Sequence, residues 1–339
     1  MRPFAYSRPS SMAEALLEAR RSVAAEPSPS AAFLVGGTTL IDLMKLDVLR
    51  PETVIDLGAL ADEFGAIRQD GSALRLGAFA KMARAAADPA VAENYPVIAQ
   101  SLALAASAQL RNMASLGGNV LQRTRCAYFR DPSWGACNKR APGSGCAALG
   151  GANRMHAVLG TSQHCIATYP GDFAQALLAL DASVTIIGPS GNRVIPFAEL
   201  HRLPATTPHR ETNLAPGDII AEFIVPAAAW TRRSLYLKIR DRQSYEFAVA
   251  SVAVALDLDG EVVREARIAL GGLASVPWRA REAEAALEGR TITPGTALAA
   301  ATAAFADAVP QSHNAFKITL GRSALQRALL EAASMEVRP

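Results

Sequence analysis

Cysteine is scarce in this chain of 339 residues: only four are present, and all of them lie between Cys126 and Cys165. An excess of charge of one sign is lacking too: 34 Lys and Arg residues against 31 Asp and Glu residues leave a net charge of +3, which is too small to favour nucleic acid or a membrane surface as partner. No apolar run reaches the ~20 residues that a membrane-spanning helix needs. The opening "MRPFAYSRPSSMAEALLEAR" lacks the apolar core of a signal peptide and a twin-arginine pair before it. These absences predict a cytoplasmic protein, or a periplasmic one exported with a partner that carries the signal.

The rest of the composition predicts a soluble globular chain, since half of the residues are hydrophobic and 19% are charged. Its length predicts two or three domains of ~100–150 residues. The apolar pattern within residues 1–58 predicts a strand, a helix and a second strand. Hairpins and alanine-rich helices are expected within residues 59–226. Residues 227–339 predict an antiparallel sheet backed by helices.

Two local predictions concern the middle of the chain. The alanine-rich run Val97–Ala108 is expected to be helical. The stretch "SLGGNVLQ" (Ser115–Gln122) is expected to be a glycine turn that enters a strand.

The four cysteines occupy one loop, in which ten, eight and eighteen residues separate Cys126, Cys137, Cys146 and Cys165. None of these spacings is the C-x-x-C pair of a typical structural zinc site. Two disulfides would suit an exported protein. An iron–sulfur cluster needs four thiolates and accepts wider spacings. The residues alone therefore leave three alternatives open: an iron–sulfur cluster, a zinc site, and disulfides or free thiols.

The other polar residues of the loop favour an anionic guest. His156 and His164 are further candidate ligands, but four cysteines already complete a tetrahedral set, and the ordinary alternative is a surface or interface histidine. Asp131 is the single acid of the loop, against six cations in or beside it. These cations are Arg123, Arg125, Arg130, Lys139, Arg140 and Arg154. Four thiolates around an iron–sulfur cubane carry negative charge that nearby cations and backbone N–H groups offset.

Two glycine turns are candidate phosphate sites. "FLVGGTTLI" (Phe33–Ile41) places two glycines and two threonines between a strand and a helix, so that consecutive N–H groups can converge on a phosphate. "SLGGN" (Ser115–Asn119) is a second such turn. Neither is a G-x-G-x-x-G or Walker motif, and each can also be an ordinary turn. Two of them in one domain favour a pyrophosphate site, because flavin dinucleotides are often gripped from two sides.

Two charged residues allow two interpretations each. Asp172, in "TYPGD", is either a helix N-cap or a ligand contact. Lys238, in the apolar strand "LYLKIR", is either a solvated lysine on an edge strand or a residue that faces a ligand.

Several stretches together resemble the FAD-binding subunit, or medium domain, of the xanthine dehydrogenase and molybdenum hydroxylase family. They are "LVGGTTLIDLMK", "RNMASLGGN", "TYPGDFAQALLALDA", "IIAEFIVP" and "FKITLGRSALQRAL", and the resemblance covers nearly the whole chain. The cysteine loop resembles an insertion found in the FAD subunits of bacterial periplasmic aldehyde oxidoreductases, where it holds a [4Fe–4S] cluster.

The resemblance implies an α+β fold in three parts. Residues 1–58 would be a βαβ FAD-binding subdomain, and residues 59–226 a second FAD-binding subdomain with the iron–sulfur loop 122–167 inserted. Residues 227–339 would be an α+β domain with an antiparallel sheet and helices. The two FAD-binding parts would sandwich the cofactor in the manner of the vanillyl-alcohol-oxidase-like flavoproteins, which do not have a Rossmann fold.

The resemblance also implies the site residues. The FAD pyrophosphate and ribityl chain would be wrapped by Leu34, Val35, Gly36, Gly37, Thr38, Thr39, Leu40 and Ile41. The opposing clamp would be formed by Ser115, Gly118 and Asn119, while Asp172 would hold a polar part of the dinucleotide. Ile220 and Lys238 would approach the flavin. The [4Fe–4S] ligands would be Cys126, Cys137, Cys146 and Cys165.

The function implied is electron transfer within a heterotrimer. A large molybdopterin subunit would oxidise an aldehyde to a carboxylic acid with water as the oxygen source, and a small subunit with two [2Fe–2S] clusters would relay the electrons. This chain would receive them at FAD and pass them to an external acceptor, so no residue of it is predicted to be a catalytic acid or base. Nucleic acid and membrane are not expected as partners.

Three alternatives remain. The first is the FAD and [4Fe–4S] subunit of a hydroxybenzoyl-CoA reductase-like complex, in which electrons flow toward the substrate. The second is a non-catalytic, zinc-stapled scaffold subunit, which would be colourless where an iron–sulfur protein is brown. The third is a standalone flavin oxidase, which would be active without a partner.

Overall fold

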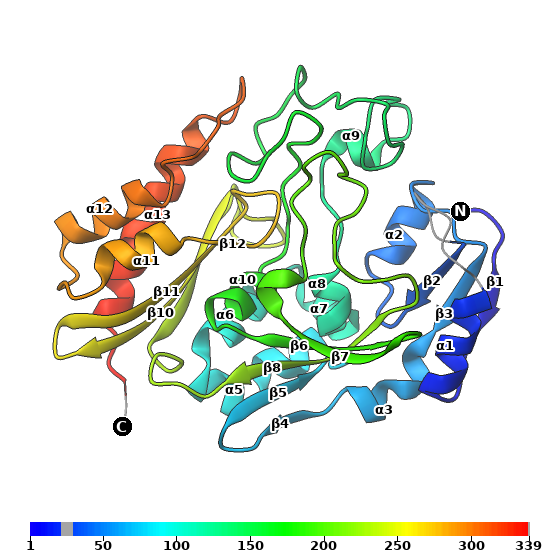
Figure 1. Ribbon diagram of the computed structural model, residues 1–339, viewed down its shortest axis with the longest axis horizontal. Coiled ribbons are helices and arrows are strands. Elements are labelled where there is room, and N and C mark those ends of the chain that lie inside the picture. The colour runs from blue at the N-terminus through cyan, green and yellow to red at the C-terminus, as the bar shows by residue number, and fades with distance from the viewer. Residues whose placement is uncertain (22–29, 338–339) are drawn as a thin grey trace.

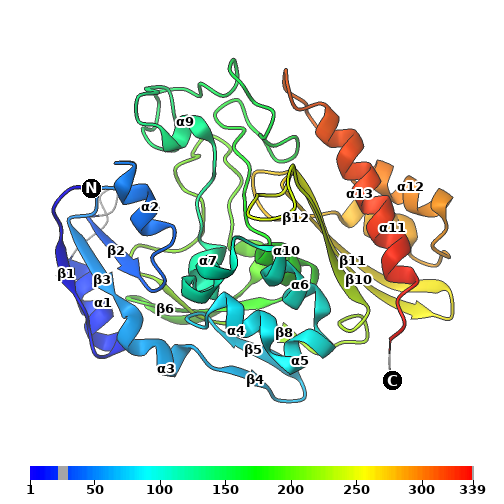
Figure 2. The same cartoon turned by 180° about the vertical axis from the view of Figure 1, so that it is seen from behind.

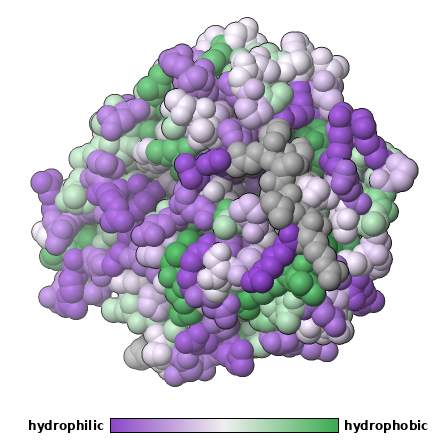
Figure 3. Space-filling model, turned by 45° about the vertical axis from the view of Figure 1, so that its right-hand side comes forward, coloured by the Kyte–Doolittle hydropathy of each residue, from purple (hydrophilic) through white to green (hydrophobic). Residues whose placement is uncertain are grey.

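The computed structural model describes residues 1–21 and 30–337, and their architecture is the predicted α+β fold (Figure 1). Three sheets follow one another along the chain, with three, five and four strands. Within the described residues, no helix combines the length and the apolarity needed to cross a membrane. Figure 3 shows polar side chains over much of one face, with small apolar patches between them.

The first sheet is parallel and has the strand order β1-β3-β2. Its elements are β1 (Ala5–Ser7), α1 (Met12–Arg21), β2 (Ala31–Leu34), α2 (Leu40–Lys45) and β3 (Thr53–Asp56). The predicted strand–turn–helix–strand unit is therefore confirmed, since β2, α2 and β3 lie where the apolar pattern places them. A 3₁₀ turn η1 (Leu57–Leu60) and a short helix α3 (Ala61–Phe64) lead to the next sheet.

The second sheet is antiparallel, with the strand order β4-β5-β8-β6-β7. Its strands are β4 (Ile67–Gln69), β5 (Ala73–Gly77), β6 (Ser183–Gly188), β7 (Gly191–Pro196) and β8 (Ile219–Pro226), and η2 (Phe197–Glu199) follows β7. Helices cover one face of it (Figure 2): α4 (Met82–Ala87), α5 (Pro89–Asn94), α6 (Pro96–Leu104), α7 (Ala108–Met113), α8 (Leu116–Val120) and α10 (Phe173–Ala179). Every residue of α10 is buried, which makes this helix the centre of the core.

The structure corrects both local predictions for this region. The run predicted to be helical over Val97–Ala108 ends at Leu104, and a second helix begins at Ala108, because Ala106 has a φ of +48° that no α-helix accepts. Ser115–Gln122 does not enter a strand but forms α8. The reason is that the Ser115 hydroxyl accepts a hydrogen bond from the N–H of Gly118 at 3.2 Å and so caps a helix.

The third sheet is antiparallel, with the strand order β12-β11-β10-β9. Its elements are β9 (Ser234–Ile239), β10 (Ala250–Asp259), β11 (Val262–Gly271), β12 (Trp278–Arg279), α11 (Arg281–Leu287), α12 (Pro294–Ala303) and α13 (Phe316–Ala333). Successive residues of β10 point to opposite faces. Val252 and Val254 pack with the helices α11–α13, whereas Ala253 and Ala255 belong to the core of the second sheet. Both faces of this sheet are therefore buried.

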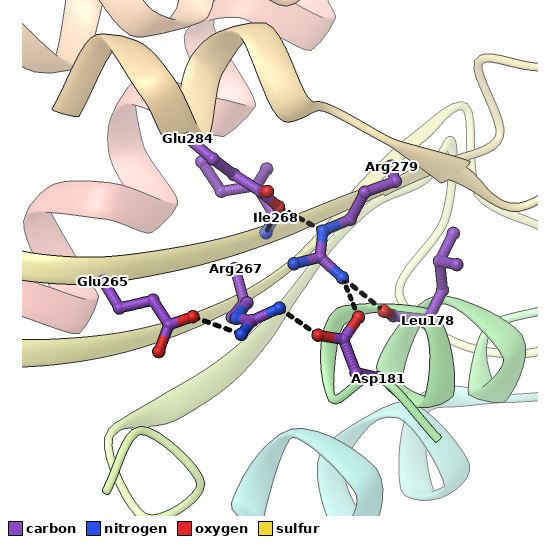
Figure 4. Close-up of polar contacts among 7 residues, drawn as sticks. All are labelled: Leu178, Asp181, Glu265, Arg267, Ile268, Arg279 and Glu284. Atoms are coloured by element: carbon purple, nitrogen blue, oxygen red, sulfur yellow. Dashed lines mark hydrogen bonds and ion pairs between the residues drawn. The ribbon is translucent and has the colours of Figure 1, made fainter. Parts of the chain in front are cut away.

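A polar seam joins the last sheet to α10 (Figure 4). The Arg279 guanidinium contacts the Leu178 carbonyl at 2.8 Å and the Asp181 carboxylate at 2.6 Å, and it also pairs with Glu284. Arg267 pairs with the same Asp181 carboxylate. Only 7% of the Arg279 side chain is exposed, so these partners satisfy a nearly buried cation.

Candidate functional site

The two glycine turns lie against each other. Gly36 follows β2 and approaches the end of α7 so closely that a Cβ atom there would overlap the Met113 carbonyl oxygen. Gly37, next in the chain, has a φ of +74°, which glycine adopts without strain. Its added Cβ would meet the side chains of Leu34 and Ile41, which pack around the turn. The two turns, 78 residues apart from Gly37 to Ser115 in the sequence, thus form one cradle.

A cavity of about 230 Å³ opens between the two turns. The predicted residues that line it are Val35, Gly36, Gly37, Thr38, Thr39, Leu40, Ser115, Gly118 and Ile220. Its other walls are largely apolar and include Phe33, Leu43, Leu57 and Phe79.

A second cavity of about 420 Å³ adjoins the first and shares Thr38, Thr39 and Gly118 with it. Asn119 and Asp172 line this second cavity. Leu34, Ile41 and Lys238 do not line either cavity. The continuous space has the extent and the two-sided grip that a dinucleotide requires.

Two buried polar atoms in the second cavity indicate what would fill it. Asn119 Oδ1 and Arg125 Nε are shielded from solvent and have no hydrogen-bond partner in the protein. Buried polar groups are nearly always hydrogen-bonded, so a ligand with donors and acceptors fits this part of the site. Together with the backbone cradle and the apolar walls, these residues fit FAD.

Two side chains of the last sheet hydrogen-bond to the Asp172 carboxylate. Its Oδ1 accepts a hydrogen bond from the Tyr236 hydroxyl and its Oδ2 one from the Lys238 ammonium, each at 2.7 Å. Burial raises the pKa of Asp172, while Lys238 and the hydrogen bond from Tyr236 act against that rise. Asp172 precedes α10, but its side chain does not cap that helix. Lys238 therefore does not line the cavity itself. It contacts Asp172, which does.

The cysteine loop, residues 122–167, projects beyond the sheets and contains the short helix α9 (Ala127–Arg130) (Figure 1). All four cysteines are free and line one small cavity. Cys137 and Cys146 face each other as an isolated antiparallel bridge. The structure thus brings together the four residues that the sequence predicts as ligands.

Backbone amides point at two of the four sulfur atoms, those of Cys126 and Cys165. The N–H groups of Tyr128 and Phe129 point at Cys126, and the N–H of Ala167 donates to Cys165 Sγ at 3.5 Å. Burial raises the pKa of Cys126 to about 12 and that of Cys165 to about 11. A metal centre would have to displace these protons, because only thiolates are ligands.

The four cysteines share a cavity but do not form a recognisable metal-binding group. Among the described residues, no three or more histidine, cysteine or acidic side chains are placed so that they could hold a metal ion. The arrangement of the cysteines therefore does not distinguish an iron–sulfur cluster from a single zinc ion.

The cations of the loop have partners that the sequence does not reveal. Burial alone would raise the pKa of Glu211, but Arg123 and Lys139 lower it to about 2, at distances of 2.7 and 2.5 Å. Asp42 accepts hydrogen bonds from Arg125 and Arg130. Arg154 pairs with Asp241, and Arg140 donates to the carbonyls of Tyr128 and Phe129. Three carboxylates from outside the loop thus offset half of the six positive charges in or beside it.

The loop is also anchored to the flavin-side helix α2. Leu43 and Val48 pack against Phe129 and Cys137 in a small apolar cluster, and Cys126 lies beside it. Leu43 also lines the first cavity. One side chain thus touches both the candidate dinucleotide cavity and the cysteine cluster.

The histidines of the loop differ in their surroundings. His156 is buried, its Nε2 lies 3.1 Å from Cys126 Sγ, and burial lowers its pKa to about 4. His164 is exposed, and its backbone carbonyl accepts a hydrogen bond from Asn138. His156 is thus the histidine that reaches a cysteine.

Two families match this chain. Residues 2–228 match the family described as the FAD binding domain in molybdopterin dehydrogenase. Residues 235–332 match the CO dehydrogenase flavoprotein C-terminal domain. The chain therefore belongs to the FAD-binding subunits of the molybdenum hydroxylase family, and it is an oxidoreductase subunit.

Individual relatives agree with this family. The chain is similar to the aldehyde oxidoreductase FAD-binding subunit PaoB of Escherichia coli (strain K12), with 43% identity over 98% of this chain and 99% of the relative. It is 26% identical to the carbon monoxide dehydrogenase medium chain of Hydrogenophaga pseudoflava, over 91% of this chain and 88% of the relative.

Solved structures have the same fold. A carbon monoxide dehydrogenase structure from Hydrogenophaga pseudoflava superposes with a TM-score of 0.75 at 27% identity, covering 98% of each chain. Quinoline 2-oxidoreductase from Pseudomonas putida 86 gives a TM-score of 0.74 over 98% of this chain and 97% of that chain. Its identity is 23%, so this second likeness concerns the fold alone.

Proposed function

We propose that this chain is the FAD- and [4Fe–4S]-binding electron-transfer subunit of a molybdenum-dependent aldehyde oxidoreductase. The observation that carries the proposal is the position of the four cysteines. They line one cavity, and Leu43 joins them to the neighbouring cavity between the glycine turns. The identity of 43% to an aldehyde oxidoreductase FAD-binding subunit supports aldehydes as the substrates of the complex.

The proposed partners are a large molybdopterin-binding subunit and a small subunit with [2Fe–2S] clusters. Relatives named as medium chains support such a heterotrimer. In it, the large subunit oxidises the aldehyde with water as the oxygen source, and this chain passes the electrons to an external acceptor. The complex works in the periplasm after export with a signal-bearing partner, or in the cytoplasm.

The residues of this chain position the cofactors, because the redox chemistry belongs to the cofactors themselves. FAD, when bound, accepts electrons in pairs and can release them one at a time. The cradle of Gly36, Gly37 and Ser115 lets backbone amides approach the pyrophosphate. Asn119 and Asp172 offer polar contacts in the second cavity. The four cysteines supply the thiolates of the cluster.

Co-purification tests the proposal. Affinity purification of the tagged chain from its native host, under anaerobic conditions, is expected to yield a molybdopterin subunit and a ferredoxin-like subunit in equal amounts with it. The isolated chain is expected to show no aldehyde oxidation, and the complex robust oxidation with an artificial acceptor. Aldehyde oxidation by the isolated chain at the rate of the complex, or purification as a lone protein, would contradict the proposal.

A further inference from the structure

Cys126 makes a side-chain contact with a histidine that the other three cysteines lack. The Nε2 atom of His156 lies 3.1 Å from Cys126 Sγ, within hydrogen-bond reach of a sulfur atom. The imidazole is only 6% exposed and lies with its ring centroid 6.1 Å from that of Tyr128. Its other nitrogen, Nδ1, is buried and has no partner in the protein. The hydrogen bond to the sulfur atom is thus the polar contact that the His156 side chain makes.

The direction of this hydrogen bond follows from the chemistry of a cluster ligand. A cysteine that binds iron does so as a thiolate, which has no proton to donate. The proton between the two side chains must then be on Nε2, so the imidazole donates and the Cys126 sulfur atom accepts.

The C-terminal domain fixes His156 in this position. Its backbone carbonyl accepts hydrogen bonds from Lys317 Nζ at 3.1 Å and from Asn314 Nδ2 at 3.2 Å. Lys317 belongs to α13, Asn314 precedes that helix, and both side chains are fully buried. Asn314 also donates to the carbonyl of Ala157, at 3.1 Å. A rigid helix of another domain thus positions the residue that contacts the cysteine.

We propose that His156 is a positioning residue of the iron–sulfur centre, which raises its reduction potential by donating a hydrogen bond to the Cys126 sulfur atom. This inference rests on the proposed function, because it requires the cluster. Reduction adds negative charge to a cluster, and a hydrogen bond to a ligand sulfur atom stabilises that charge. The three other cysteines lack this imidazole contact, so the effect is specific to one corner of the cluster.

The test compares two replacements of His156 in the complete complex. H156L removes the donor at similar volume, whereas the side-chain amide of H156Q can place an N–H near the position of Nε2. Redox titration of the cluster, followed by low-temperature EPR, is expected to give a lower potential for H156L. The ratio of reduced to oxidised cluster at a fixed potential should fall about tenfold. This corresponds to a reduction potential about 59 mV lower, for a one-electron step. H156Q is expected to retain most of the wild-type potential.

The control is S133A, which changes an exposed residue of the same loop that does not line the cysteine cavity. Its cluster potential is expected to equal that of the wild type. Equal potentials for wild type, H156Q and H156L would overturn the inference, and so would an equal decrease in H156L and S133A. Iron and FAD content per chain would be measured for every variant, to show that each is loaded.

If H156L loses its iron, a measurement on the wild-type protein tests the role of His156 instead. Pulsed EPR of the reduced cluster, in protein labelled with ¹⁵N-histidine, is expected to show a weak nitrogen coupling and a proton that exchanges in D₂O. A coupling of the size of a direct Fe–N bond would make His156 a ligand and overturn the inference, as would the absence of any histidine coupling. A wild-type protein without iron would instead refute the proposed function itself.

Discussion

The ammonium of Lys238 lies 2.7 Å from the Asp172 carboxylate, and the two side chains are only 1% and 4% exposed. Lys238 is on β9 of the last sheet, and Asp172 precedes α10 at the wall of the second cavity. The pair thus couples the C-terminal domain to the candidate FAD site. Burial opposes both charges, so each depends on the other.

Replacing Lys238 by methionine is expected to destabilise the protein by about 3–5 kcal/mol, because it leaves Asp172 as an unpaired buried carboxylate. FAD occupancy should fall as well. Urea unfolding and the flavin-to-protein ratio are the measurements. The double variant K238M/D172N is the control, since it removes both charges and should recover part of the lost stability. A K238M protein as stable as the wild type would contradict this assignment.

Replacing Gly36 by alanine is expected to weaken FAD binding at least about tenfold, or ~1.4 kcal/mol. The added Cβ would overlap the backbone carbonyl of Met113 and force the two glycine turns apart. G295A serves as the matched control, because a Cβ there meets only Thr293 Oγ1, at 3.8 Å. Fluorescence titration of the FAD-depleted protein measures the affinity. Equal affinities of G36A and G295A would mean that the turns do not form the cofactor cradle.

The buried amine of Lys317 predicts a pH dependence of stability. Burial, and secondarily the charge of Arg154, lowers its pKa from 10.5 to about 7. Between these values the unfolded chain binds a proton that the folded chain lacks, so stability rises with pH. From pH 7 to pH 9 the gain is about 2 kcal/mol.

The variant K317M loses this pH-dependent contribution to stability. It also loses the hydrogen bonds from Lys317 to backbone carbonyls, but that cost does not change with pH. The difference in thermal midpoint between wild type and K317M should therefore shift by a few degrees in favour of the wild type between pH 7 and pH 9. Taking the difference cancels the titration of all other groups. A difference that is independent of pH would show that Lys317 stays protonated in the folded protein.

Replacing Cys146 by alanine is expected to remove the cluster and to leave FAD at well over half occupancy. Three thiolates leave one iron site open, and the broad absorbance near ~400 nm should fall. The FAD contacts lie in other segments, before and after the loop. S133A, an exposed change in the same loop, is the control. Full iron retention in C146A would exclude Cys146 as a ligand, and complete loss of flavin would show that the two sites form one structural unit.

Local patterns in the sequence predict much of the fold. The apolar periodicity of residues 31–58 predicts β2, α2 and β3, and the β4–β5 pair is one of the hairpins expected within residues 59–226. Alanine-rich runs carry less information, and the break at Ala106 has no glycine or proline to signal it. The sequence does contain a signal for the helix α8, since Ser115 is a good N-cap residue three positions before Gly118.

The contacts that build the site depend on distant residues. Asp42 and Arg130 are 88 residues apart, and no periodicity relates them. The sequence does not reveal that Tyr236 donates to Asp172, although Tyr236 lies two residues before Lys238 along β9 and therefore shares its face. The convergence of the four cysteines was predictable from their spacing and the family resemblance together, whereas the approach of His156 to Cys126 required the structure.

Metal and flavin analysis of this subunit, purified anaerobically and separated from its partners, tests the central claim most directly. We expect about one FAD and about four iron atoms per chain, with acid-labile sulfide in equal amount to the iron. A chain with zinc in place of iron, or with FAD and neither metal, would contradict the claim that the four cysteines hold an iron–sulfur cluster beside a flavin.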